Sequence, residues 1–439
     1  MISPASEGVK DSRPRRSFLT PGRGSRYGQR VAITTWRNVL TKKWPALMIM
    51  TLVALPMLVG QTPDDVRTVA RGANTFAWKM FSQIAPPEGN VFFSPYSISS
   101  ALAMTYVGAR GRTAGQMADV LGFSLAPDKL YPALSGLMAG LNAKDKPYEL
   151  FVANALWGQA RYPFAPAFIQ TIDAYFRGGF KEVDFISEAG REEARRAINA
   201  WTEGRTANRI KDLIKPGILT FQTRLVLTNA IYFKGKWALQ FKAADTRDMP
   251  FVVSKTRTAS VPMMCQKGEF GYAEAAGVQV LEMRYAGGDL SMVVLLPTSS
   301  SSVEKLQEAL PDRFESWLAA LVPQSVDVFL PRFKLEQEFI LNDQLAALGM
   351  SDAFSEQAAD FAGMRSDGKK DLSISKVVHK AFVEVNEEGT EAAAATAVVM
   401  GIKSISMTPV FKADHPFVFL IRDVRTGTIL FLGRMSSPR

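Results

Sequence analysis

Apolar residues recur at helical spacing through the first long patterned segment, which runs from Thr62 to the Pro86-Pro87-Glu88-Gly89 stretch. Spacings of three and four residues place these side chains on one face of a helix. Thr62, followed by Pro63 and two acidic residues, is typical of a capped helix start, and the later prolines end the helix. Similar spacing predicts further helices over residues 98–106, 166–175, 191–202 and 302–318.

The later half of the chain instead carries runs of β-branched and aromatic residues, separated by Gly, Pro and Ser. Helices concentrated early and strands concentrated late predict an α+β fold, with helices packed on large mixed β-sheets, rather than a repeating βαβ design. No internal repeat is visible. The predicted strands span residues 225–233, 278–283, 292–296, 326–333, 372–385, 417–421 and 429–432.

One segment has a helical preference although the runs on both sides of it favour β-strands. Residues 387–400 read EEGTEAAAATAVVM, and a run of alanines behind acidic residues favours a helix. The segment nevertheless lies between the β-rich run at 372–385 and Pro409, which precedes another apolar strand. We therefore expect a ribbon that is able to pair as a strand but is held outside a sheet, with Gly389 at its base absorbing the backbone rotation needed for entry.

The side chains of this segment would alternate between two faces if it became a strand. The inward set contains only small or apolar residues, so no proline or charge in it opposes insertion into a core. Propensity alone favours the alternative, an exposed alanine-rich helix. The inward set is Thr390, Ala392, Ala394, Thr396 and Val398, and the outward set is Glu391, Ala393, Ala395, Ala397 and Val399.

Residues 385–392, VNEEGTEA, resemble the hinge of the reactive loop in inhibitory serpins, which are suicide inhibitors of serine proteases. Other stretches resemble serpin segments in serpin order: 90–98 (NVFFSPYSI), 228–237 (TNAIYFKGKW), and HPFVF from His415 with FLGR from Phe431. Together they span roughly residues 62 to 439. Several separated motifs in the right order are far stronger than one isolated match, so the chain is identified as resembling this family throughout that span.

The resemblance implies an exposed reactive loop at about residues 387–409, with the cleaved bond between Lys403 and Ser404. A lysine at this position suits the acidic specificity pocket of a trypsin-like protease, which is the expected partner. Cleavage after Met400 or Met407 would instead favour chymotrypsin-like or elastase-like enzymes. The implied mechanism is irreversible: the cleaved loop enters the central sheet and traps the acyl-enzyme.

The resemblance also assigns roles to three groups of residues. A polar cluster beneath the opening of the central sheet is expected to hold two strands together reversibly, with Trp237 at the top of that opening. An ion pair between Arg332 and Glu387 is expected to steady the base of the loop. The cluster comprises Ser94, Ser97, Asn229 and His379, and the hinge comprises Glu387, Glu388, Gly389, Thr390, Glu391, Ala392, Ala393, Ala394, Ala395 and Thr396.

Two other functions remain open. A non-inhibitory serpin acting as a carrier or chaperone would share the fold, although the small-residue hinge argues against it. An enzyme with an unrecognised site is the second, but the chain lacks the common nucleophile, phosphate-binding and zinc motifs and has only two histidines. We expect no catalytic residue, metal or cofactor. Cys265, the only cysteine, is expected to be a structural thiol.

Charge separates the N-terminal segment from the rest of the chain. Residues 1–43 hold ten of the 52 basic residues and two of the 42 acidic ones, so the remainder, with 42 basic and 40 acidic residues, is nearly neutral. The net charge of +10 is therefore an N-terminal feature, and no nucleic-acid partner is expected. With 47% hydrophobic residues the chain is able to bury a large core.

Residues 44–60 are uncharged and mostly apolar, and they directly follow Lys42-Lys43. They are short for a membrane span and suit the core of an export signal, with a retained signal anchor, a twin-arginine signal at Arg15-Arg16 or an organellar transit segment as alternatives. We predict an N-terminal extension over residues 1–60 and one serpin domain over 61–439. The protein is expected to be a monomer that is exported to an extracellular or periplasmic location, and membrane-bound only if residues 44–60 are retained.

Overall fold

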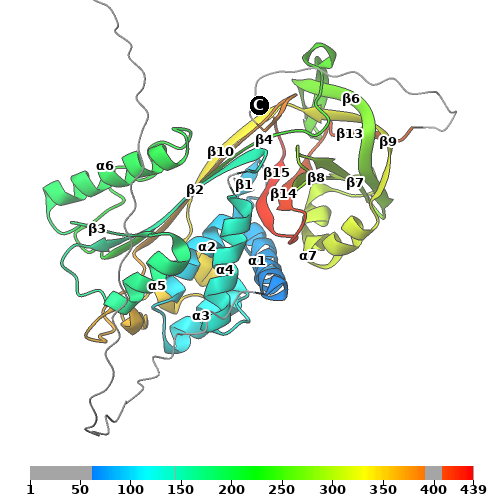
Figure 1. Ribbon diagram of the computed structural model, residues 1–439. Helices are drawn as coiled ribbons and strands as arrows, with labels where there is room; N and C mark the ends of the chain where they lie inside the picture. Colours follow the sequence, from blue (N-terminus) through cyan, green and yellow to red (C-terminus); the bar gives the residue numbers. More distant parts are fainter. Residues whose placement is uncertain (1–61, 144, 391–407, 439) are drawn as a thin grey trace, which may run out of the picture. The chain divides into compact units, whose positions relative to one another are not determined.

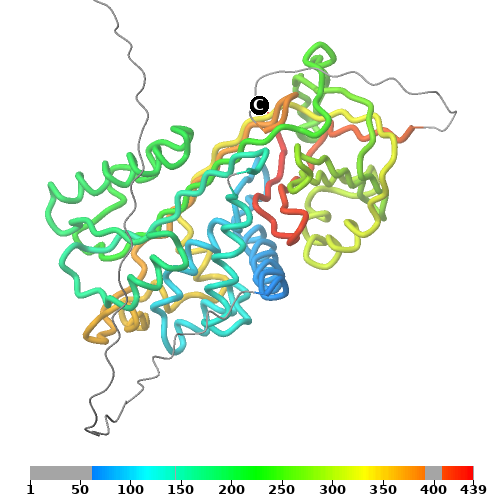
Figure 2. The backbone as a smooth tube through the Cα atoms, viewed as in Figure 1, coloured from blue at the N-terminus to red at the C-terminus, as the bar shows by residue number. Residues whose placement is uncertain are grey.

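The computed structural model describes residues 62–143, 145–390 and 408–438 (Figures 1 and 2). Contacts divide the chain into residues 1–57 and 58–439, and everything described below belongs to the second unit. The predicted boundary after residue 60 stays a prediction. Within the described residues no helix combines the length and apolar character needed to cross a membrane.

Eight α-helices form in the described residues, most of them in the first half of the chain. The predicted cap of the first helix is confirmed: the Thr62 side chain accepts a hydrogen bond from the Asp65 backbone at 3.1 Å, and the Asp65 carboxylate reaches back to Thr62. All five predicted helices are present, whereas α3, α4 and α8 were not predicted. The helices are α1 Pro63–Ile84, α2 Pro95–Tyr106, α3 Gly111–Leu121, α4 Pro127–Leu141, α5 Pro166–Phe176, α6 Glu188–Arg205, α7 Val303–Ala319 and α8 Asn342–Ala347.

The central sheet has the strand order β10-β11-β12-β4-β2-β3. Strands β4 and β11 run parallel to one another, whereas β2 runs antiparallel to β4. The predicted strand at 372–385 begins only at Lys376, because the Ile374 backbone N–H donates to the Ala353 carbonyl outside the sheet. The strands are β2 Tyr148–Gln159, β3 Phe180–Val183, β4 Leu225–Lys236, β10 Phe333–Ile340, β11 Lys376–Val385 and β12 Gly389–Thr390.

The second sheet has nine strands, in the order β1-β15-β14-β8-β7-β6-β9-β13, with β5 paired to β6. The predicted strand at 326–333 is divided: β9 lies in this sheet, and β10, after Arg332, lies in the other. Two mixed sheets with helices packed on them confirm the predicted α+β class. The strands are β1 Val91–Phe93, β5 Arg247–Ser254, β6 Arg257–Ala275, β7 Val278–Arg284, β8 Leu290–Pro297, β9 Val322–Pro331, β13 Val410–Lys412, β14 Phe417–Asp423 and β15 Ile429–Met435.

The central sheet is buried on both faces. Along β4, Leu227 and Ile231 belong to the main core, which also contains residues of α2, whereas Val226 and Tyr232 belong to a second core with residues of α6. Figure 1 shows α6 on the opposite side of this sheet from α2. Because successive strand residues face opposite ways, an added strand would have to place acceptable side chains in both cores.

Candidate functional site

Strands β4 and β11 are direct neighbours over only part of their length. Residues Lys376–Phe382 pair with Val226–Tyr232, and above this stretch the short strand β12 lies between the two strands. Thr390 pairs with Val385 on one side and with Gly235 on the other. The first residues of the expected ribbon therefore already occupy the upper end of the gap between β4 and β11.

Thr390 is fully buried at this position, and its hydroxyl lies 2.9 Å from the hydroxyl of Tyr285. The Tyr285 ring stacks on Trp237 with a centroid separation of 4.6 Å. The indole N–H of Trp237 donates to the Asn386 carbonyl at 3.0 Å, and its backbone N–H donates to the Glu388 carbonyl at 2.8 Å. Trp237 therefore holds the turn that leads into β12, and its expected role at an opening of the sheet stays a prediction.

Gly389 has a steric reason to lack a side chain. A Cβ atom at this position would lie 2.0 Å from the carbonyl oxygen of Gly235, far inside van der Waals contact. The turn before it is closed by Asn386, whose side-chain oxygen accepts hydrogen bonds from the backbone of Glu388 and Gly389 at 3.1 and 3.3 Å. Any residue other than glycine at 389 would push the ribbon out of the gap.

Arg332 and Glu387 lie together at the base of the loop. The Arg332 Nε donates to both Glu387 oxygens at 2.7 and 2.8 Å, its Nη2 also contacts Oε1, and the Thr246 hydroxyl donates to Oε1 at 2.5 Å. Burial of Glu387 raises its pKa, but the donors from Arg332 and Thr246 outweigh burial and hold the pKa below its ordinary value. The carboxylate is therefore charged and fixed in direction.

The polar cluster lies lower in the β4–β11 pairing, where His379 on β11 is directly opposite Asn229 on β4. The Ser94 backbone N–H donates to His379 Nε2 at 3.1 Å, so Nε2 is the acceptor and Nδ1 carries the proton that faces Asn229 Oδ1. Complete burial of the ring lowers the pKa of His379 to about 3. A neutral, fully hydrogen-bonded histidine therefore joins the two strands.

Asn229 extends the cluster away from the histidine. Its amide nitrogen donates to the Ser97 hydroxyl and to the Asn154 side-chain oxygen, each at 2.5 Å. Ser94 caps α2 by accepting from the Ser97 backbone at 3.1 Å and donates to the Leu430 carbonyl. Asn154, on β2 opposite Asn229, was missed from the sequence, and the only available signal was an amide within an otherwise apolar strand.

The remaining predicted site residues lie outside the described residues. They are the reactive bond Lys403–Ser404 and the hinge residues Glu391, Ala392, Ala393, Ala394, Ala395 and Thr396. The described chain resumes before β13, which pairs with β9.

Other candidate chemistry is sparse in the residues that the structure describes. No group of three or more His, Cys, Asp and Glu side chains there could hold a metal ion. Cys265 is half-buried and its thiol lies 3.5 Å from the Met263 carbonyl. Burial raises the pKa of this thiol, which fits the expected structural role.

Comparison with known proteins places this geometry in context. The family model described as "Serpin (serine protease inhibitor)" matches residues 71–438. Leukocyte elastase inhibitor A of Rattus norvegicus is 43% identical over 374 residues, covering 83% of this chain and 97% of its own length, and leukocyte elastase inhibitor of Homo sapiens is 42% identical over 381 residues, covering 83% and 98%. The solved structure of Serpin48 from Tenebrio molitor is 31% identical, with a TM-score of 0.76, and covers 85% of this chain and 99% of that one.

Proposed function

This chain belongs to the serpin family of serine protease inhibitors, and we propose that it acts as an irreversible inhibitor of a trypsin-like serine protease. The protease serine attacks the Lys403 carbonyl carbon, the Ser404 amine leaves, and an ester joins Lys403 to the protease. The freed loop then enters the central sheet as a new strand before water hydrolyses the ester. A sheet whose gap is already entered by its own hinge supports this proposal more than any other single observation.

Insertion requires the pairing between Lys376–Phe382 and Val226–Tyr232 to part below β12. Thr390 already faces a buried hydroxyl, so strand alternation would place Ala392, Ala394 and Thr396 on the same side. All of these are small enough to pack beneath the sheet without opening a cavity or burying a charge. Adding about 14 residues would carry the loop end roughly 45 Å, enough to drag the attached protease across the sheet.

The identity of the residue before the cleaved bond decides the target. Lys403 would pair with the acidic group at the base of a trypsin-like pocket, whereas an elastase-type pocket is small. The relatives in Rattus norvegicus and Homo sapiens are named for inhibition of elastase, which favours a second candidate, cleavage after Met400 or Met407 by an elastase-like or chymotrypsin-like enzyme. Both candidates require insertion of the loop into the same sheet, and they differ only in which peptide bond the protease cleaves.

A denaturing gel separates these candidates. The purified chain is incubated with trypsin, chymotrypsin and elastase, and a band that survives denaturation at the summed mass is expected with trypsin. Lys403→Ala should abolish that band, and mass spectrometry of the released C-terminal peptide should find Ser404 at its start. Clean cleavage by all three enzymes without a covalent band would instead identify a non-inhibitory carrier.

We also propose that residues 1–60 form a separate extension that directs export and that the serpin domain acts as a monomer outside the cell or in the periplasm. The uncharged run at 44–60 after Lys42-Lys43 supports export. N-terminal sequencing of protein recovered from the producing cells tests this, because a start after residue 60 in the exported fraction is expected and an intact N-terminus in the cytosol would refute export.

A further inference from the structure

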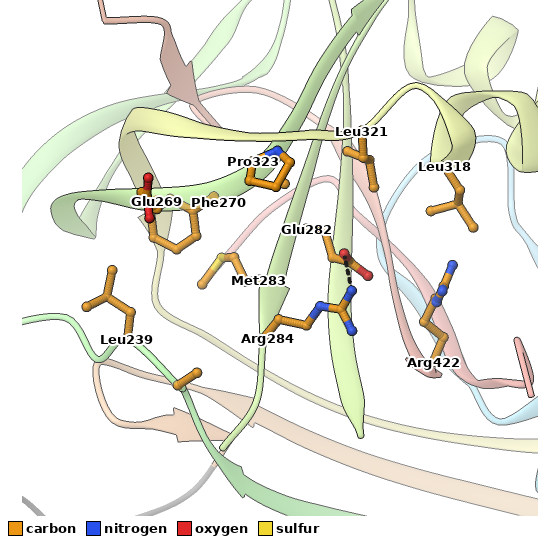
Figure 3. Close-up of a pocket in the computed structure, with 12 residues that line it drawn as sticks. Leu239, Glu269, Phe270, Glu282, Met283, Arg284, Leu318, Leu321, Pro323 and Arg422 are labelled. Atoms are coloured by element: carbon orange, nitrogen blue, oxygen red, sulfur yellow. Dashed lines mark ion pairs between the residues drawn. The ribbon is translucent and has the colours of Figure 1, made fainter. Parts of the chain in front are cut away.

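A cavity of about 560 Å³ lies at the nine-stranded sheet, and its lining includes no residue from the base of the reactive loop (Figure 3). Strands β6, β7 and β14, the C-terminal end of α7 and the start of β9 supply its walls. Its apolar lining comes chiefly from Leu239, Phe270, Met283, Leu318, Leu321 and Pro323. A cavity of this size admits a small organic molecule.

Arg422 lines the cavity without a partner. It is half-buried on β14, its Nε atom is fully buried, and among residues 62–143, 145–390 and 408–438 the guanidinium makes no hydrogen bond or ion pair. Burial lowers the pKa of the Arg422 guanidinium below its ordinary value. A half-buried guanidinium without a hydrogen bond has lost part of its hydration, and a bound anion would replace it.

Three carboxylates act on Arg422 through their charge, those of Glu282, Glu315 and Asp423, and none of them forms an ion pair with it. Two of the three are engaged elsewhere. Glu282 accepts from the Ser291 hydroxyl at 2.8 Å and pairs with Arg284 at 3.0 Å, and Figure 3 shows this pair standing apart from Arg422. Asp423 accepts from the Thr426 hydroxyl at 2.7 Å and pairs with Arg425. Among the described residues that line this cavity, two charged side chains make no hydrogen bond or ion pair: Arg422, which is half-buried, and Glu269, which is exposed. Arg422 is therefore the one unpaired cation in the described wall.

A second cavity, of about 510 Å³ between α1 and α7, provides an internal comparison. It is also lined by an arginine, but Arg434 donates to the carbonyls of Gly89 and Pro86 at 3.0 and 2.6 Å and to the Gln307 side chain at 2.8 Å. All three guanidinium nitrogens of Arg434 therefore donate to protein atoms, and few of its hydrogen-bond donors are available to a ligand. The two cavities are similar in size and differ in whether the cation is satisfied.

We propose that the cavity at Arg422 binds a small amphipathic carboxylate. The carboxylate would receive two parallel hydrogen bonds from the two Nη groups of the guanidinium, which are not among the fully buried atoms, and the apolar body would lie against Leu318 and Met283. Planar bidentate recognition suits carboxylates, and the apolar lining excludes strongly hydrated inorganic anions. This function is independent of the reactive loop.

Calorimetric titration of the full chain with decanoate tests the proposal, with 1-decanol as the uncharged probe. Decanoate should bind at one site at least tenfold more tightly than decanol. Arg422→Met should weaken decanoate binding by about 10- to 100-fold and leave decanol binding unchanged, because only the charge-assisted hydrogen bonds are lost. Equal affinity of the parent and Arg422→Met for decanoate would overturn the proposal.

Two further variants locate the ligand. Leu321→Trp fills the proposed cavity and should weaken the binding of decanoate, whereas Ser82→Trp fills the cavity at Arg434 and should leave it unchanged. Loss of binding in Ser82→Trp alone would place the ligand in the other cavity and refute the assignment. Arg422→Met should melt no lower than the parent, because the guanidinium has no partner to lose, and a large fall would show a structural role instead.

Discussion

The upper and lower halves of the contact between β4 and β11 are held together in different ways. In the upper half the strands are already apart. Tyr285 contacts β12 between them, and Trp237 and Arg332 hold the turn that precedes β12. In the lower half the strands pair directly, and a buried polar cluster joins them at His379 and Asn229. Under the proposed mechanism, the upper half is already open to the loop and the lower half must part, so the lower half would set the barrier to insertion.

The largest expected effect comes from placing a charge in the upper half. Thr390→Arg places a guanidinium at a position that is fully buried already in the uncleaved protein, so keeping β12 between β4 and β11 costs several kcal/mol both before and after cleavage. We expect the yield of covalent protease complex to fall more than tenfold, with the protein cleaved as a substrate. The measurement is the ratio of complex to cleaved product on a denaturing gel.

Glu391→Arg is the matched control, since residue 391 falls in the outward set and changes charge without entering the core. It should keep most of the complex. If both variants inhibit as well as the parent, loop insertion does not drive inhibition in this chain.

The second effect belongs to the lower half. Asn229→Ala removes the acceptor for His379 Nδ1 and the donor to Ser97 and Asn154, leaving several buried polar groups unpaired. We expect the free energy of opening between β4 and β11 to fall by about 3 kcal/mol, or roughly 100-fold in the opening equilibrium. Amide hydrogen exchange over residues 376–382 measures this directly.

Thr228→Ser, next to Asn229 but outside the cluster, is the control and should change exchange less than threefold. Unchanged protection in Asn229→Ala would show that the apolar pairing alone keeps the lower half closed.

The two halves also differ in how many of their contacts could be predicted from the sequence. The strand predicted at 372–385 is present from Lys376 onward, and the Arg332–Glu387 pair and the contact between His379 and Asn229 were expected from the resemblance to serpin segments. Asn154 and Thr246 were not expected, because their contacts depend on the register of β2 against β4 and on a loop that no local pattern specifies.

The division of 326–333 between two sheets was also not predicted, since β9 and β10 follow one another with only Arg332 between them and the two sheets are distinguished only by which strands they pair with. Local propensity identified elements correctly where a pattern was long and periodic, and failed where the partner strand decides.

The third expected effect is a pH dependence of opening in the lower half, where His379 lies. His379 has its pKa lowered to about 3 in the folded protein, against an ordinary value of about 6.5 once exposed. The contribution of His379 to the free energy of opening is therefore constant above pH 6.5. Below that pH it favours opening, because His379 binds a proton in the opened state and stays neutral in the closed state. Between pH 7 and pH 5 this favours opening by about 2 kcal/mol, measurable as faster exchange over residues 376–382 after correction for intrinsic rates.

His415→Asn is the control for this pH effect. The hydrogen bond with Asp414 raises the pKa of His415, so its contribution has the opposite sign, and its removal should leave the acid-induced opening in place. His379→Gln should flatten the profile. An identical profile in His379→Gln and the parent would show that other groups open the sheet in acid.

The smallest expected effect returns to the upper half. Arg332 is 44% exposed in its side chain whereas Glu387 is 8% exposed, so the pair is partly screened by solvent and Arg332→Ala should cost only about 1 kcal/mol. Glu387 keeps its hydrogen bond from Thr246 after the substitution but loses the donor that lowers its pKa most, so its pKa should rise. Arg332→Lys should lie between the parent and Arg332→Ala, since an ammonium cannot reproduce the bidentate contact. The expected readout is faster exchange at the amides of Gly389 and Thr390 with no change over residues 376–382. Equal acceleration in both stretches would mean that the two halves open as one unit, and the distinction between them would fail.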